Sequence, residues 1–120
     1  MNVDDIQAGT IVRGHHPLDE EDRLAHYALI VSVERVVTGH VTITAAYGSS
    51  RKVSPYCHLP YEFVIVVPDE LEAMSLRAPI RFDMRRTVEI MPDDITETVG
   101  HVGEHRYLLR RLSKAYRASM

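Results

Sequence analysis

The strongest constraint on the fold is a pair of β-forming runs joined by a tight turn. Residues 27–33 form an almost continuous apolar, β-branched run, which is typical of a strand buried on both faces. Thr38-Gly39 supplies a turn, and apolar side chains then alternate with threonines through residues 41–45, as in a half-buried return strand. The pattern predicts an antiparallel hairpin with strands over 26–36 and 40–47.

The rest of the chain reads mostly as further short strands. Pro68 followed by acidic residues predicts one or two helical turns over 68–74. Residues 104–119 carry apolar side chains at helical spacing on one stripe and basic side chains on another, which predicts an amphipathic terminal helix. We therefore expect a mainly β fold, a small curled antiparallel β-barrel with a short internal helix and a C-terminal helix. The further strands are expected at 10–13, 61–67, 80–84 and 87–91, and loops at 15–24 and 48–60.

Composition narrows the class of protein. The chain has 120 residues, 45% apolar and 26% charged, as is ordinary for a globular domain, so disordered and collagen-like classes are excluded. Its apolar runs are far shorter than the roughly 20 residues of a membrane helix, and residues 1–5 are acidic where an export signal would be basic. The lone Cys57 cannot form an intramolecular disulfide. We expect a single cytoplasmic domain over residues 1–120.

Charge is distributed unevenly along the chain. Residues 1–22 hold six acids and one base, a net charge of −5, whereas residues 104–120 hold five bases and one acid, a net charge of +4. A basic surface at one end can meet an anionic partner, or the two ends can face each other. A solvated helix face beside an acidic loop explains the same pattern without any partner.

Motifs for metal, nucleotide and hydrolase chemistry are weak. His101 and His105 have the i, i+4 spacing of a zinc-binding helix, but Gly103 lies between them, and Cys57-His58 lacks a second Cys/His pair. The sequence contains no Gly-x-x-x-x-Gly-Lys loop and no Gly-x-Ser-x-Gly elbow. We therefore expect no metal site and no cofactor.

A more informative set of residues joins the two ends of the predicted hairpin. Arg23 and His26 precede its first strand, and residues 48–52 follow its second, so the hairpin brings them to one edge of the sheet. Cations there can bind a phosphate, an imidazole can move the proton of a ribose 2′-hydroxyl, and hydroxyls can hydrogen-bond a phosphoryl oxygen. Serines that cap a turn beside solubilising bases are the competing interpretation. The hydroxyls and cations of this second loop are Ser49, Ser50, Arg51 and Lys52.

Several segments resemble the PemK/MazF growth-inhibitor family. Residues 9–12, a charged loop and residues 26–33 resemble its opening, a strand after a glycine, a loop, an Arg-Pro pair and a Val/Leu-rich strand ending in Ser. Residues 44–50 are similar to its second motif, a strand ending in a Thr/Ser-rich turn. Residues 79–84 resemble a segment of a divergent PemK-like branch, and residues 100–102 with the following helix match the family's ending.

The resemblance implies an SH3-like β-barrel, usually a homodimer, that cleaves single-stranded RNA without a metal and is neutralised by an antitoxin protein. The family's chemistry is carried by the Arg of the Arg-Pro pair and by a Thr/Ser of the second motif; the first pair reads His26-Tyr27 here, and the hydroxyl is Ser49 or Ser50. Either His26 acts as acid and base while Arg23 supplies charge, or catalysis is lost and the barrel only binds nucleic acid or protein. A structural or assembly protein on the same fold is the third alternative. The residues expected to bind RNA are Arg51, Lys52 and Arg81.

Overall fold

Six strands and two α-helices make up the chain in the computed structural model, which describes residues 6–14, 26–51, 53–54 and 58–120. The strands are β1 (Thr10–Gly14), β2 (His26–Arg35), β3 (Val41–Ser49), β4 (Glu62–Ile65), β5 (Ile80–Ile90) and β6 (Ile95–His101). The α-helices are α1 (Pro68–Ala73) and α2 (Arg106–Ser119), and the 3-10 helices are η2 (Pro92–Asp94) and η3 (Val102–Glu104). No α-helix within the described part of the chain is long and apolar enough to cross a membrane.

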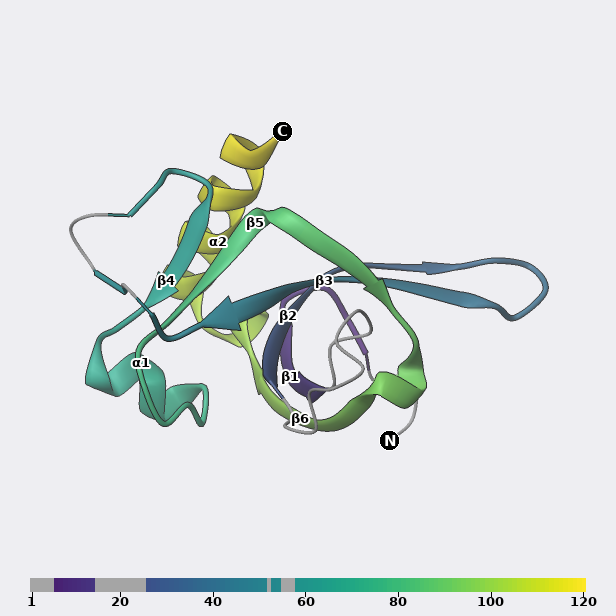
Figure 1. Ribbon diagram of the computed structural model, residues 1–120, viewed down its shortest axis with the longest axis horizontal. Helices are drawn as coiled ribbons and strands as arrows, with labels where there is room; N and C mark the ends of the chain where they lie inside the picture. The colour runs from purple at the N-terminus through teal and green to yellow at the C-terminus, as the bar shows by residue number, and fades with distance from the viewer. Residues whose placement is uncertain (1–5, 15–25, 52, 55–57) are drawn as a thin grey trace.

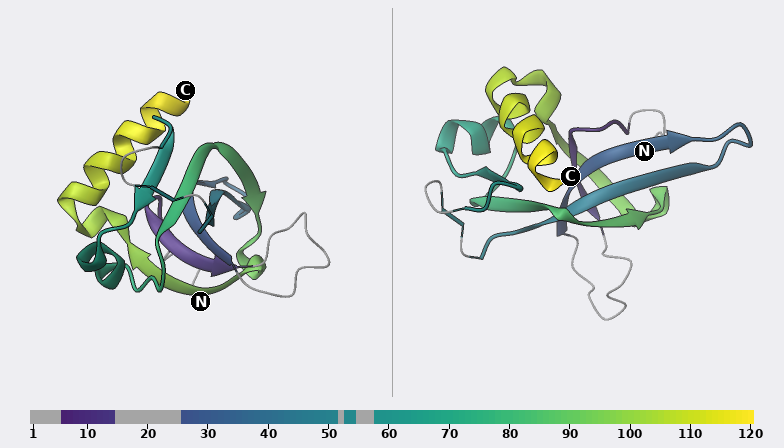
Figure 2. Two further views of the ribbon diagram at one scale, coloured as in Figure 1. Left: turned by 60° about the vertical axis from the view of Figure 1, so that its left-hand side comes forward. Right: turned by 90° about the horizontal axis from the view of Figure 1, so that it is seen from above.

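All neighbouring strands are antiparallel and form one strongly curled sheet in the order β4-β5-β3-β2-β1-β6 (Figures 1 and 2). The predicted fold class, mainly β with a C-terminal helix, is confirmed. The word barrel needs one correction, because β4 and β6 remain the two edges of the sheet and do not pair with each other. The curl results from the right-handed twist of each strand and from the irregularities in the pairing.

The predicted hairpin is β2–β3. It pairs in register from Ala28–Tyr47 to Arg35–Val41, with one irregularity between Ile30 and Ser32. At its tip the amide of Gly39, at φ +86°, donates to the carbonyl of Val36. The tip extends well beyond the rest of the sheet (Figure 1).

The two strands expected at 80–84 and 87–91 are a single bent strand, β5. Its last part pairs with the middle of β3 as far as Thr87–Ala46, and its first part pairs with the end of β3 from Phe82–Gly48. Between these pairs β5 has four residues, 83–86, where β3 has one, Tyr47. The extra residues bend β5. The sequence pattern showed a break in the alternation at this point, which was interpreted as a gap between two strands.

The strand β6 was missed by the sequence prediction, which left residues 95–99 unassigned. It pairs with β1 at the edge of the sheet, with two irregularities in register. Of its residues only Ile95 and Gly100 are buried, so the apolar alternation that marks a strand is almost absent. Gly100 packs tightly, because a Cβ there would lie 3.1 Å from the backbone of Met74.

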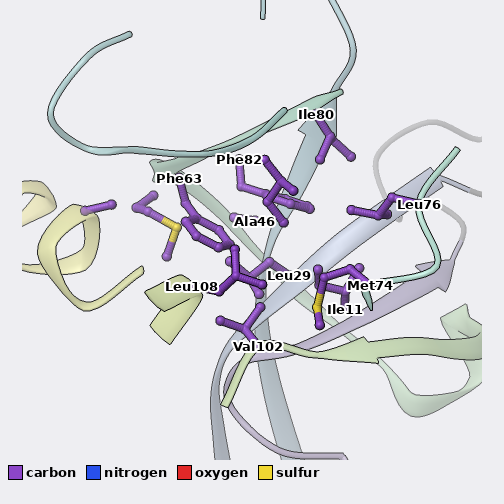
Figure 3. Packing of buried hydrophobic residues seen from close by; sticks show 13 residues of the cluster. Ile11, Leu29, Ala46, Phe63, Met74, Leu76, Ile80, Phe82, Val102 and Leu108 are labelled. Atoms are coloured by element: carbon purple, nitrogen blue, oxygen red, sulfur yellow. The ribbon is translucent and has the colours of Figure 1, made fainter. Parts of the chain in front are cut away.

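Two apolar clusters lie on opposite faces of the sheet. The first packs the outer face against α1 and α2, with Phe63 and Phe82 stacked at 6.2 Å between ring centroids and Leu108 of α2 covering them (Figure 3). The second fills the inside of the curl with residues from β1, β2, β3, β5 and β6, including Val12 and Ala28. The terminal helix therefore packs on the outside and leaves the inside of the curl to the strands.

Helix α2 begins at Arg106, two residues later than expected, after η3. It buries Leu108 and Ala115 against the sheet. Arg111 anchors the helix to α1 and β4. It donates to both carboxylate oxygens of Glu70 at 2.7 and 2.8 Å and to the carbonyl of Val64 at 3.1 Å. The predicted amphipathic helix is thus confirmed, with its basic stripe exposed. That stripe consists of Arg106, Arg110, Lys114 and Arg117.

Candidate functional site

A groove of about 570 Å³ opens where β5 bends away from β3. We name it the β5 groove. Its walls come from the end of β3, the segment before β4, and the bend of β5, so three distant parts of the chain meet there. It is lined by Tyr47, Ser49, Leu59, Tyr61, Glu62, Arg81, Asp83, Arg86, Thr87 and Val88.

The structure brings three of the expected site residues together at one end of this groove. Ser49 is the last residue of β3 and pairs directly with Arg81 on β5. The Ser49 hydroxyl oxygen accepts the backbone N–H of Arg51 at 3.2 Å, and the Arg81 Nε donates to the Arg51 carbonyl at 2.8 Å. The serine therefore does cap a turn, as the competing interpretation held, and that turn is bound to an arginine of the groove.

A carboxylate orients Arg81. Its Nη1 donates to Glu62 Oε2 at 2.8 Å, and Glu62 Oε1 accepts the backbone N–H of Leu59 at 2.8 Å. Burial of Glu62 acts to raise the pKa of its carboxyl, but the hydrogen bonds from Leu59 and Arg81 outweigh it, so this pKa lies below its ordinary value. Glu62 is therefore ionised near neutrality and holds the guanidinium of Arg81 in one position beside Ser49.

Aromatic rings supply flat surfaces in the groove, which Tyr47 and Tyr61 both line. The guanidinium of Arg85 lies 4.8 Å from the centroid of the Tyr61 ring, a cation–π contact. Tyr47 is half-buried, and burial, followed by the charge of Asp94, raises the pKa of its phenol to about 12. The Tyr47 phenol therefore stays protonated over the physiological pH range and remains a hydrogen-bond donor.

His26 lies on the same face of the sheet as Ser49. It is the exposed first residue of β2, where its partner on β1 is Gly14. The β2–β3 ladder ends at the pair Ala28–Tyr47. His26 lies two positions before Ala28 on β2, and Ser49 lies two positions after Tyr47 on β3. Side chains alternate along a strand, so His26 is on the same face as Ala28, and Ser49 is on the same face as Tyr47. Ala28 and Tyr47 are cross-strand partners in the cluster inside the curl, so the two faces are the same. The imidazole and the hydroxyl are therefore on the same side at the same end of the hairpin.

The remaining expected site residues contribute less to the described geometry. Ser50 and Arg51 are exposed directly after β3. Arg23 and Lys52 lie outside the described residues. The loop expected at 48–60 begins two residues later than predicted, because Gly48 and Ser49 belong to β3.

His101 and His105 do not share a helix, since His101 ends β6 and His105 precedes α2. The Thr10 hydroxyl and His101 Nδ1 lie 3.3 Å apart and form a hydrogen bond across the β1–β6 pair. Within the ranges that the structure describes, no three His, Cys, Asp or Glu side chains gather into a group that could hold a metal.

Sequence reasoning missed most of the groove. The signal was present in residues 80–86, where Arg81, Asp83, Arg85 and Arg86 place four charges in a segment that otherwise reads as a strand. Charged side chains in the middle of a strand indicate an exposed or irregular stretch. With cations for phosphate, a hydroxyl for hydrogen bonds and rings for stacking, the β5 groove can bind a single-stranded nucleic acid.

Three solved structures share this arrangement of strands and helices. The Mycobacterium tuberculosis toxin MazF-mt6 aligns with a TM-score of 0.63 and 18% identity over 92% of this chain and 94% of that one. An endoribonuclease in complex with its cognate antitoxin, from a mycobacterial species, aligns at 0.64 and 13% identity over 95% and 93%. An endoribonuclease from a mycobacterial species aligns at 0.64 and 17% identity over 99% and 92%.

No protein-family model matches the sequence, and a search of curated proteins finds no match. At these identities the structural likeness concerns the path of the backbone, and it covers nearly the whole chain and nearly the whole of each neighbour. The resemblance predicted from the sequence is confirmed at this level. The chain has the fold of the MazF toxins.

Proposed function

We propose that the chain is a toxin-like endoribonuclease that cleaves single-stranded RNA without a metal ion. The observation that carries the proposal is the pairing of Ser49 with Arg81 in a groove that two arginines, two acids and two tyrosines line. Similar folds occur in solved toxins and endoribonucleases, which favours this activity over other uses of a phosphate-binding groove.

Each expected site residue has a role in this reaction. His26 takes the proton of a ribose 2′-hydroxyl, whose oxygen attacks the neighbouring phosphorus, and the bond from phosphorus to the 5′-oxygen breaks. The departing 5′-oxygen receives a proton from the imidazolium so formed. Arg23 supplies positive charge for the phosphoryl oxygens, and the hydroxyl of Ser49 or Ser50 donates to one of them. The cations proposed to hold the flanking phosphates are Arg51, Lys52 and Arg81.

We further propose that the chain acts as a cytoplasmic homodimer bound by an antitoxin protein. Leu109 and Tyr116 of α2 keep 41% and 43% of their surface exposed, and they border a mainly apolar groove of about 280 Å³ that Val31 and Met84 also line. An exposed apolar surface of this kind supports an interface with a second copy. One of the similar structures is an endoribonuclease bound to its cognate antitoxin.

Cleavage of RNA by purified protein in the presence of EDTA tests the activity. We expect cleavage by the native chain, and a loss of at least about a hundredfold in rate for His26→Ala, because general acid–base catalysis contributes roughly that much or more. His40→Ala is the matched control, since His40 is exposed at the opposite end of the same hairpin. Intact RNA at high protein excess, or equal rates for His26→Ala and the native chain, would reject the nuclease proposal.

A second candidate is a binding module without catalysis. It is favoured by His26-Tyr27 at the place of the family's Arg-Pro pair and by the exposed basic stripe of α2. This candidate predicts salt-sensitive binding to an anionic partner, no RNA turnover, and loss of binding when Arg106, Arg110 and Lys114 are changed to Glu. Under the nuclease proposal the same triple variant keeps its cleavage rate on short RNA.

A further inference from the structure

Asp83 is one of two acids in a groove that also contains Arg81 and Arg86. It lies at the start of the β5 bend, with 21% of its side chain exposed, on the same strand and face as Arg81. A carboxylate repels phosphate, so Asp83 weakens the attraction of the groove for a nucleic-acid backbone. Its presence calls for a partner that donates hydrogen bonds.

The backbone uses only part of this carboxylate. Asp83 Oδ1 accepts the N–H of Arg85 at 2.9 Å and so stabilises the bend. Asp83 Oδ2 lies 3.7 Å from Nε of Arg86, whose side chain is 89% exposed, and an exposed pair at this separation is weak. An ionised carboxylate offers about four acceptor positions, so Asp83 can accept further hydrogen bonds from a ligand in the groove.

The other acid of the groove is different. Glu62 is the cross-strand partner of Asp83, and its side chain is only 7% exposed. Both of its oxygens accept hydrogen bonds at 2.8 Å, one from the Leu59 amide and one from Arg81. Glu62 therefore holds the groove together, and Asp83 is the acid with acceptor capacity left for a ligand.

The surfaces around Asp83 favour a flat ligand. Tyr47 and Tyr61 both line the groove, and the guanidinium of Arg85 fixes the ring of Tyr61. Leu59 and Val88 add apolar surface to the lining of the groove. Aromatic side chains in a groove that also carries arginines are a usual means of holding an unpaired nucleobase by stacking.

We propose that the β5 groove is a subsite for an unpaired guanine base, read by Asp83. The Watson–Crick edge of guanine presents two adjacent donors, N1–H and one N2–H, to an acceptor-only group, whereas adenine, cytosine and uracil each present one donor beside acceptors. The two oxygens of a carboxylate match the guanine pair, and Arg81 and Arg86 are placed to bind the flanking phosphates. This inference rests on the proposed function, because it names the base preference of the same groove.

Binding of short RNA to the full chain tests the proposal. The probes are uridine oligonucleotides with one central guanosine, inosine, adenosine or cytidine, carrying 2′-fluoro groups so that no 2′-hydroxyl can attack. We expect the guanosine probe to bind about tenfold more tightly than the adenosine probe, as for a bidentate base contact. Inosine, which lacks the N2 amino group, falls between the two.

Asp83→Asn is the decisive variant, because the amide oxygen still accepts from Arg85 and keeps the bend while the second acceptor becomes a donor. We expect it to lose the guanosine preference with an unchanged melting temperature. Arg86→Ala is the control, since it weakens binding of all four probes by a similar factor.

Equal binding of all four probes by the native chain, tighter binding of cytidine than of guanosine, or an unchanged guanosine preference in Asp83→Asn would overturn the subsite and leave the nuclease proposal intact. Absence of binding to any probe at low salt would reject both.

Discussion

The β2–β3 hairpin and the β5 bend differ in the regularity of their pairing. The hairpin keeps its register over most of its length, with one irregularity, whereas β5 inserts four residues opposite Tyr47 of β3. In the regular region, the side chains of β2 and β3 that point into the curl are apolar. The irregular region carries the groove, with its arginines, acids and tyrosines. Regular pairing therefore builds the scaffold, and its interruption creates the space and the polar surface of the candidate site.

The bend is supported from behind by close packing. Gly48 lies opposite Phe82, and a Cβ at Gly48 would come within 2.9 Å of the Phe82 ring. Phe82 in turn stacks on Phe63 in the outer core (Figure 3). The groove on one face thus depends on a glycine and an aromatic pair on the other, which explains how an irregular strand keeps a single geometry.

The largest effect is expected from Gly48→Ala. The added methyl group meets Ile80 and Phe82 in a fully packed core, and we expect the free energy of unfolding to fall by about 2 kcal/mol. Gly103→Ala is the control, because a Cβ at Gly103 meets nothing within 4 Å, and it should change stability by less than about 0.5 kcal/mol. Urea denaturation of both variants measures the difference. Equal stabilities would show that the bend is not held by this contact.

The same contrast explains what the sequence could predict. The hairpin followed from a periodic pattern within about twenty neighbouring residues, as did the amphipathic helix α2. The register shift at β5 depends on how Gly48 packs on Phe82, residues 34 positions apart (82 − 48), and no local pattern encodes such a contact. Strand β6 was missed for a related reason. It lies at the edge of the sheet and buries only Ile95 and Gly100, so its sequence shows almost no alternation of apolar and polar residues.

The candidate site was predicted in part for the same physical reason. Ser49 was found because it lies at the end of the second strand of the hairpin, Arg51 because it comes just after that strand, and His26 because it begins the first strand. Tyr47, Tyr61 and the acids reach the groove only through the bend of β5, so their role could not be predicted before the bend was known. Arg81 was named from the resemblance, whereas its ion pair with Glu62 forms only when β4 and β5 pair in the folded chain.

An intermediate effect is expected at the ion pair that braces the groove. Glu62→Gln removes the charge that accepts hydrogen bonds from Arg81 and Leu59. We expect the free energy of unfolding to fall by about 1.5 kcal/mol near neutrality, as is typical of a charged hydrogen bond. Because the pKa of Glu62 is lowered in the folded state, its contribution is present above the unfolded pKa of about 4.5 and disappears as pH falls through the folded value.

Chemical denaturation at neutral and acidic pH separates this contribution from others. The gap in stability between the native chain and Glu62→Gln should narrow as the pH falls below 4.5. Glu97→Gln is the matched control, since Glu97 is 54% exposed in its 3.1 Å pair with Arg13, and it should cost less than about 0.5 kcal/mol. A gap that stays constant with pH would mean that Glu62 acts by shape alone.

The smallest effect is expected at the tip of the hairpin, the regular half of the comparison. Gly39 has φ +86° and no atom within 4 Å of an added Cβ, so Gly39→Ala strains the backbone without any clash. We expect the free energy of unfolding of Gly39→Ala to fall by about 1 kcal/mol. Gly39→Asn should recover most of it, because asparagine tolerates the left-handed region. Neither variant should alter RNA binding, since the tip lies at the far end of the hairpin from Ser49 (Figure 1). Thermal unfolding with the RNA probes measures both quantities, and loss of RNA binding in Gly39→Ala would show that the hairpin is part of the site.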